Sequence, residues 1–245
     1  MAEITLVLEP EVVTIPLPDV SQIITEDDTP VDNLFSAKQQ RLLVESLYTS
    51  WQIDRPFVAD ANVGIYNVPR DPAIVPDVFL SLDVAIAEDW YAKEHRTYFI
   101  WEFGKPPDVV IEIVSNNKGG ELDRKLRAYA RLRVWYYVVY DPQRLLQDEP
   151  LQVYELRLNK YVPKSDAFLD SLDLGLTLWP GVYENKEGEW LRWRDAQGSL
   201  LPTGAELSAL ERQRAEQERQ RADQEQQRAD QLAAQLRALG IDPEI

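Results

Sequence analysis

The chain has 245 residues and a net charge of −16, with 44% hydrophobic residues, seven tryptophans and eleven tyrosines. It can therefore bury a sizeable core, but its acidity argues against non-specific nucleic-acid binding through a broad basic surface. The absence of cysteine excludes disulfides, thiolate metal sites and cysteine nucleophiles. The chain has no run of 18 apolar residues, and its acidic N-terminus lacks a secretory signal, so we expect a cytoplasmic protein without a membrane span.

The first half of the chain predicts one helix and several strands. Residues 1–30 are acidic and contain prolines, and we expect an N-terminal extension there with one short strand. The apolar spacing of residues 36–51 predicts a helix with Ser36 as its N-cap. Apolar, β-branched and aromatic runs predict strands over 57–68, 74–86 and 96–103, with a turn at PRDP between the first two.

The second half begins with the apolar run PDVVIEIVS, which predicts a buried strand, and continues through the turn NNKGG into a helix over 121–133. VWYYVVYD predicts the next strand. The remaining expected elements are a hairpin of outer strands over 151–163 and a C-terminal wrap with short strands over 166–200.

The C-terminal segment repeats every seven residues, as ERQRAEQ, ERQRADQ and EQQRADQ from Glu211 onward. This pattern predicts a long helix, and heptads are typical of a coiled coil. The apolar seam is thin, because it holds only alanines before its last turns, so a weak coiled coil and a single charged helix both remain open. The seam residues are Ala215, Ala222, Ala229, Leu232, Leu236 and Leu239. We expect one domain over 31–204 and a coiled-coil helix over 205–240.

Two charged residues interrupt apolar patterns in the middle of the chain. Both faces of the predicted strand are apolar around Glu112, so the strand is expected to be central, and burying an unpaired carboxylate would cost several kcal/mol. In the following helix Lys125 falls inside the apolar stripe of Leu122, Tyr129 and Leu132, at about 100° per residue. A structural salt bridge is one use of this pair, and a catalytic site is the other.

Asp77 supplies a second candidate carboxylate, at the start of a strand in VPDVFLSLDV. Asp83 shares its face but lies roughly 20 Å further along at the rise of a strand, so the two cannot share one site. Glu45 in the first helix is a further candidate, although an exposed helix carboxylate explains it equally well. Since His95 is the single histidine and is expected to lie in an exposed loop, any metal ion would be held by oxygen ligands, which favours Mg²⁺, Mn²⁺ or Ca²⁺.

Two inward carboxylates and one inward lysine have a specific chemical use. The carboxylates bind Mg²⁺ or Mn²⁺, the metal lowers the pKa of a bound water, and the lysine positions the water and stabilises charge on a phosphate. The residues therefore predict metal-assisted hydrolysis of phosphodiester bonds, with Asp77, Glu112 and Lys125 as catalytic residues and Asp77, Glu112 and Glu45 as metal ligands.

The chain resembles the Uma-family endonucleases of the PD-(D/E)XK nuclease superfamily, a family long catalogued as a domain of unknown function. The likeness covers about residues 36–200 and is carried by PD at 76–77, PDVVIEIVS, DRK at 123–125, Tyr129 and WYYVVYDP. It implies an α+β fold like that of restriction endonucleases, with a mixed central sheet flanked by helices and entered by one helix. It also implies Mg²⁺-dependent cleavage of DNA by a homodimer.

The resemblance assigns roles position by position. Asp77 and Glu112 match the metal-binding acids, and Glu45 matches the first-helix acid loosely. The usual lysine lies two residues after the second acid, where this chain has Val114. Lys125 matches a lysine that has moved from the sheet onto the helix, and Lys118 in the turn is its rival. The competing hypothesis is a catalytically silent interaction protein that assembles through a coiled-coil partner of residues 205–240.

Overall fold

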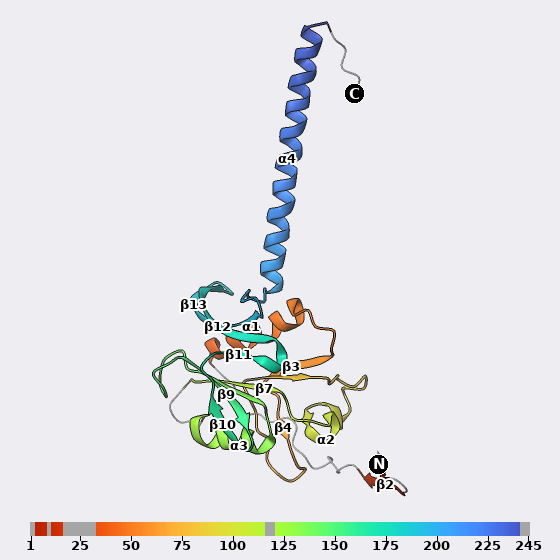
Figure 1. Cartoon of the computed structure of the whole chain (residues 1–245), viewed down its shortest axis with the longest axis vertical. Helices are drawn as coiled ribbons and strands as arrows, with labels where there is room; N and C mark the ends of the chain where they lie inside the picture. The colour runs from red at the N-terminus through yellow and green to blue at the C-terminus, as the bar shows by residue number, and fades with distance from the viewer. Residues whose placement is uncertain (1–2, 9–10, 17–32, 116–120, 241–245) are drawn as a thin grey trace. The chain divides into compact units, whose positions relative to one another are not determined.

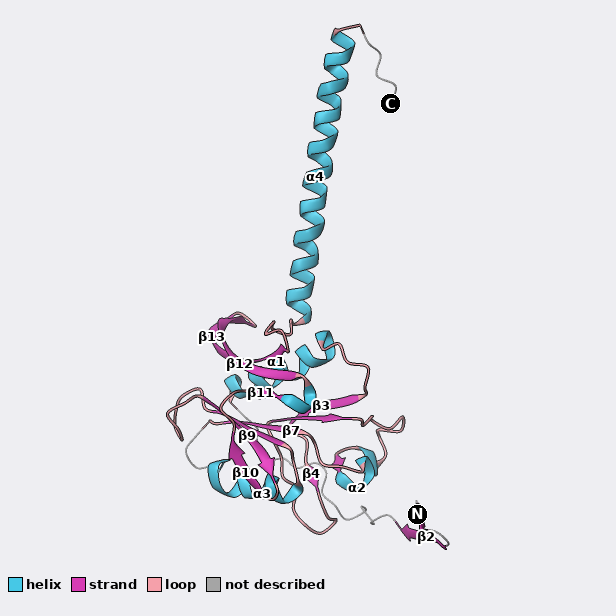
Figure 2. Ribbon diagram, viewed as in Figure 1, coloured by secondary structure: helices cyan, strands magenta, loops and turns pink. Residues whose placement is uncertain are grey.

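The computed structural model describes residues 3–8, 11–16, 33–115 and 121–240. The chain forms two compact units, which divide between Leu201 and Pro202 (Figures 1 and 2). The first unit is the predicted α+β fold with a mixed central sheet flanked by helices, and the second contains one long helix. In the described part of the chain, no helix has both the length and the apolar character needed to cross a bilayer.

The first unit is built on a central sheet, which has six strands within the described residues, in the order β10-β9-β8-β7-β5-β3. The strands are β3 (Phe57–Ala61), β5 (Val78–Leu82), β7 (Val109–Ile113), β8 (Tyr136–Tyr140), β9 (Leu151–Arg157) and β10 (Lys160–Pro163). β7 and β8 run parallel, whereas the other neighbouring pairs are antiparallel. A parallel pair needs a crossover connection, and the segment between these two strands contains a helix that serves this purpose.

The crossover helix lies on one face of the sheet, together with α2 (Figure 1). It starts with a π-helical turn, η2 (Glu121–Lys125), and continues as α3 (Leu126–Leu132). Tyr129 is fully buried against the sheet. The helix predicted over 121–133 is therefore present, with a wider first turn than expected.

The opposite face of the sheet is covered by α1 (Leu34–Ser50), whose Leu43 and Leu47 pack against the core. The helix starts two residues before its predicted limit. Its N-cap is Asn33, whose side-chain oxygen accepts a hydrogen bond from the backbone N–H of Ser36 at 2.9 Å. The prediction of Ser36 as N-cap was wrong, because the helix begins earlier, at Leu34, and Ser36 is itself the residue whose N–H the N-cap asparagine satisfies.

A second sheet packs on the same face as α1. It contains β11 (Phe168–Leu169), β12 (Leu174–Tyr183) and β13 (Lys186–Asp195), with the short helix η3 (Asp170–Leu172) between the first two. The sequence predicted short strands here, whereas β12 and β13 pair over ten residues each. The side chain of Gln39 from α1 donates to the carbonyl of Leu191 at 2.7 Å and accepts from its N–H at 3.0 Å, and so ties the helix to this sheet.

The strand predicted over 96–103 was wrong for most of its length. Only β6 (Tyr98–Phe99) is extended, pairing with β4 (Ile65–Tyr66), and the chain then turns into α2 (Ile100–Phe103). The rings of Tyr98 and Phe103 stack with centroids 4.3 Å apart. Residues five apart point to opposite faces of a strand, so this stacking requires the turn. Gly104, at φ 74°, ends α2 in a conformation that favours glycine.

The N-terminal segment contains more β structure than predicted. Strands β1 (Glu3–Leu8) and β2 (Glu11–Pro16) form an antiparallel hairpin in place of one short strand. The rest of the predicted extension, residues 1–2, 9–10 and 17–30, lies outside the described residues.

The second unit consists of α4 (Gly204–Ala238), which begins at a capping box. The side chain of Thr203 accepts from the backbone N–H of Glu206, and the Glu206 carboxylate accepts from the N–H of Thr203. At about 1.5 Å per residue a helix of 35 residues is roughly 52 Å long. Its side chains are almost all exposed, including Leu232 of the seam, and the seam residue Leu239 at its C-cap is exposed as well.

We expect deletion of residues 205–245 to leave a folded first unit, because the seam contributes little apolar surface to the core. Calorimetry should show one cooperative transition within a few degrees of that of the full chain. Light scattering of both proteins would then show whether α4 associates: a smaller number of subunits after deletion supports a coiled coil. An unchanged number of subunits would mean that any dimer forms through the first unit. Loss of the cooperative transition would show that the first unit does not fold without α4.

Candidate active site

The candidate site is centred on Glu112, in the middle of β7. This strand lies between β5 and β8, and residues on both of its faces are buried. Val109 and Ile111 belong to the core on the α1 side, whereas Val110 and Val114 belong to the core on the α3 side. Strand alternation places Glu112 on the α3 side, where it is 1% exposed.

Two side chains from the crossover helix satisfy the Glu112 carboxylate. The Lys125 ammonium lies 2.7 Å from Oε2, and the Tyr129 hydroxyl donates to Oε1 at 2.7 Å. Lys125 and Tyr129 are four residues apart, which puts them on one face of the helix. The phase of the helix therefore brings the lysine to the carboxylate, while the tyrosine, expected only to fill an apolar stripe, also holds the carboxylate in place.

The electrostatic state of Glu112 follows from its burial. The net effect raises its pKa to about 8: loss of hydration is the largest cause and the charge of Asp77 adds to it, while Lys125 and the hydrogen bond from Tyr129 act in the opposite direction. Burial, together with the carboxylate, also raises the pKa of Tyr129 well above its usual range, so that its hydroxyl stays a donor. A cation that approaches Glu112 thus competes with a proton as well as with Lys125.

Asp77 lies beside this pair, at the start of the neighbouring strand β5. Its Oδ2 accepts from the backbone N–H of Ile113, the residue after Glu112, at 2.5 Å, and its Oδ1 accepts from the side chain of Gln40 at 3.2 Å. The Asn62 amide donates to Gln40 at 3.0 Å. The structure thus brings Asp77, Glu112 and Lys125 together on one side of the sheet.

Gln40, rather than Glu45, is the residue of α1 whose side chain contacts Asp77. Five residues of helix correspond to a rotation of about 140°, so the two side chains point in different directions. The Glu45 carboxylate accepts from the hydroxyl of Tyr183 in β12 at 3.2 Å. The structure does not place Glu45 with Asp77 and Glu112, and nothing in the residue pattern of the helix singled out Gln40.

The other candidates lie away from the acids or are not described. Asp83, at the far end of β5, forms an ion pair with Arg55. His95 is half-buried in the short helix η1 (Lys93–His95), not in an exposed loop as predicted, and its Nδ1 lies 2.6 Å from the carbonyl of Asp89. Lys118, the rival lysine, lies outside the described residues.

The donor set fits a hard divalent cation. In the described ranges no three carboxylate or histidine side chains form a metal-binding group, and the carboxylates that lie near each other in this cluster are those of Asp77 and Glu112. Mg²⁺ is commonly bound through one or two carboxylates, with substrate phosphates and water completing its octahedron. The charge of Asp77 contributes to the raised pKa of Glu112, and a cation bound between the two carboxylates would reduce their mutual repulsion.

A groove of about 640 Å³ adjoins the cluster. Arg124, Lys125 and Arg131 of the crossover helix line one side, and the segment from Ile65 to Val75 lines the other. The Lys125 side chain is 25% exposed, so it contacts the buried carboxylate and the groove at the same time. The groove gives an acidic chain a local basic surface, moderated by Asp71 on its other side.

Comparison with known proteins places the chain among nuclease-like proteins. It matches the model of the Uma2 family, described as "Putative restriction endonuclease", over residues 22–182, a stretch that includes the whole cluster and ends before α4. A crystal structure titled as that of a putative nuclease belonging to DUF820 from Anabaena variabilis is 15% identical. It aligns over 66% of this chain and 76% of its own with a TM-score of 0.38. No curated protein shows significant similarity to the chain.

Proposed function

Because the chain belongs to the Uma2 family, we propose that it is a divalent-metal-dependent endonuclease that hydrolyses phosphodiester bonds in DNA. The observation that carries the proposal is the buried carboxylate of Glu112, paired with a lysine that also lines an open groove. A purely structural ion pair has no need of a second carboxylate at its side, yet Asp77 lies there and raises the pKa of Glu112.

The roles of the residues follow from their positions. Asp77 and Glu112 would hold Mg²⁺ or Mn²⁺, which lowers the pKa of a bound water and neutralises charge on the phosphate. Lys125 positions the attacking water and stabilises the negative charge that builds on the phosphate in the transition state. Tyr129 fixes the orientation of Glu112 through its hydrogen bond, and Gln40 does the same for Asp77.

Arg124 and Arg131 support DNA as the substrate, because both are exposed and both line the groove beside Lys125. Arginine side chains bind phosphate oxygens through paired hydrogen bonds. The net charge of −16 is distributed over the whole chain and leaves room for such a local site. Binding is therefore expected to weaken steeply as salt concentration rises.

The test is nicking of supercoiled plasmid by the full chain with Mn²⁺ or Mg²⁺, and with EDTA in place of the metal. We expect relaxed circles to accumulate only with the metal, and Glu112→Gln to abolish their formation. The substitution keeps the size and hydrogen-bonding shape of the side chain but removes its charge. Nicking that is independent of the metal, or that survives in the variant, would point to a contaminating nuclease.

An interaction protein without activity is the second candidate, and the exposed helix α4 is the observation that favours it. In that case the first unit would carry no metal-dependent activity, while α4 would still recruit a partner through its C-terminal seam. We propose a homodimer for the nuclease, formed by the first unit. The plasmid assay separates the two functions, since only one of them turns over DNA.

A further inference from the structure

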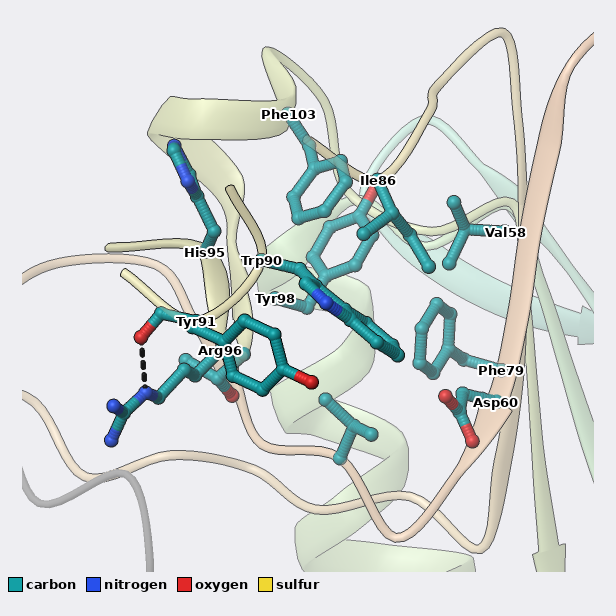
Figure 3. A pocket seen from close by; sticks show the side chains of 12 residues that line it. Val58, Asp60, Phe79, Ile86, Trp90, Tyr91, His95, Arg96, Tyr98 and Phe103 are labelled. Atoms are coloured by element: carbon teal, nitrogen blue, oxygen red, sulfur yellow. Dashed lines mark hydrogen bonds between the residues drawn. The ribbon is translucent and has the colours of Figure 1, made fainter. Parts of the chain in front are cut away.

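A second cavity, of about 580 Å³, opens over β3 and β5 and is lined largely by aromatic rings (Figure 3). Phe79 and Tyr98 form its buried floor, at 2% and 1% exposure. Trp90 and Tyr91 stand at its mouth, at 55% and 73% exposure. Exposed aromatic side chains beside a hollow are typical of binding sites, because folding gains nothing from leaving them in water.

The rings of the cavity pack against one another in pairs. Phe79 meets Tyr98 edge to face at 5.2 Å, and Trp90 meets Tyr91 edge to face at 5.5 Å. Figure 3 shows the Trp90 ring projecting into the space in front of Phe79. A flat ring that enters this space would find one aromatic partner in the floor and another at the mouth.

Polar groups at the edges of the same cavity favour a ligand that is not purely apolar. The carboxylate of Asp60, an exposed residue of β3, lies beside Phe79 (Figure 3). At the opposite end lies Arg96, whose Nε donates to the carbonyl of Tyr91 at 2.7 Å. A ligand that combines an aromatic face, a hydrogen-bond donor for Asp60 and a negative group near Arg96 would engage all of these groups.

The cavity begins next to the candidate active site. Phe79 follows Asp77 by two residues, so both side chains lie on the same face of β5, about 7 Å apart at the rise of a strand. Asp60 pairs directly with Phe79 across β3 and β5. A nucleic acid held at Asp77 and Glu112 thus passes within reach of the cavity.

We propose that this aromatic cavity binds a nucleobase displaced from the nucleic-acid strand at the active site, an inference that rests on the proposed nuclease function. A nucleobase has the required aromatic faces, its exocyclic amino group can donate to Asp60, and its own backbone phosphate can reach Arg96. Enzymes that handle single bases hold them in this way, between aromatic side chains and with hydrogen bonds to the edge of the base.

The test measures how much of the binding depends on bases. Fluorescence anisotropy compares a labelled single-stranded DNA with an abasic strand of the same length, using the full chain and Ca²⁺, with strand integrity checked on a gel. We expect the wild type to bind the normal strand about tenfold more tightly than the abasic strand, as stacking on aromatic rings requires. Trp90→Leu should remove this preference. Trp135→Leu, the matched control at an exposed tryptophan outside the cavity, should preserve it.

Equal affinities of the wild type for the two strands would overturn the proposal, as would a preference that survives in Trp90→Leu. Failure of this proposal is distinguishable from failure of the nuclease function. If the protein nicks plasmid in a metal-dependent way but shows no base preference, only the proposal about the cavity is rejected. If the protein shows a base preference that depends on Trp90 but never nicks plasmid, the cavity is supported as a nucleic-acid site and the proposal of DNA hydrolysis is rejected.

Discussion

Replacing Lys125 with methionine is expected to lower metal-dependent plasmid nicking by a factor on the order of 10² or more, as is usual when a group that stabilises transition-state charge is removed. The ammonium lies 2.7 Å from Glu112 and borders the groove, so it is the cation of the cluster placed to meet a phosphate. Methionine keeps the volume of the stem and suits the apolar surroundings.

The same variant should remain folded. Loss of the lysine leaves Glu112 buried without a cation, but its raised pKa allows the carboxyl group to take up a proton, and Tyr129 keeps its hydrogen bond. The control is Arg127→Met, since Arg127 lies on the exposed face and pairs with Asp123. If Lys125→Met unfolds at neutral pH, the pair is structural, and if it nicks like the wild type, another lysine serves the reaction.

The second large effect concerns the metal. Mg²⁺ or Mn²⁺ at a hundred times its dissociation constant stabilises a native state by about 2.7 kcal/mol, which for a chain of this size raises Tm by about 5–10 °C. We expect a rise of this order in the wild type, measured by calorimetry. Asp77→Asn and Glu112→Gln should abolish it, because each removes half of the charge that holds the cation.

The rise in Tm should also depend on pH. A carboxyl group with a pKa of about 8 is mostly protonated at pH 6.5, so the metal must displace a proton and binds less tightly there. The metal-induced rise should therefore grow between pH 6.5 and 8.5. Asp83→Asn, a carboxylate at the other end of β5, and Glu45→Gln should both respond like the wild type. If Glu45→Gln abolishes the metal-induced rise in Tm, Glu45 is a metal ligand after all.

The parts of the site that follow local periodicity were predictable from the sequence. The alternation of residues in β7 predicts that Glu112 lies in a strand with two apolar faces. The helical phase of the following segment predicts that Lys125 points toward it. Both rest on spacings within a dozen residues of chain. The Tyr129 hydroxyl could have been found in the same way, since it lies one helical turn beyond Lys125.

Residues whose role depends on distant contacts escaped prediction. Gln40 reaches Asp77 only because α1 packs where it does, and the apolar spacing of the helix does not show which of Gln40 and Glu45 faces Asp77. The turn that stacks Phe103 on Tyr98 consists of apolar and aromatic residues. Such residues suit a strand as well as a turn, so their pattern predicts a strand. Long pairing of β12 with β13 likewise depends on their partners in α1 and the core.

The placement of the lysine on the crossover helix has a consequence for heat inactivation. The carboxylates lie on the sheet, whereas Lys125 is the last residue of a π-helical turn. Its contact with Glu112 is between side chains. Partial opening of a helix costs less free energy than melting a central sheet. In the proposed nuclease, Lys125 can therefore separate from the carboxylates while the sheet is still intact, so we expect metal-dependent nicking to be lost at a lower temperature than the fold.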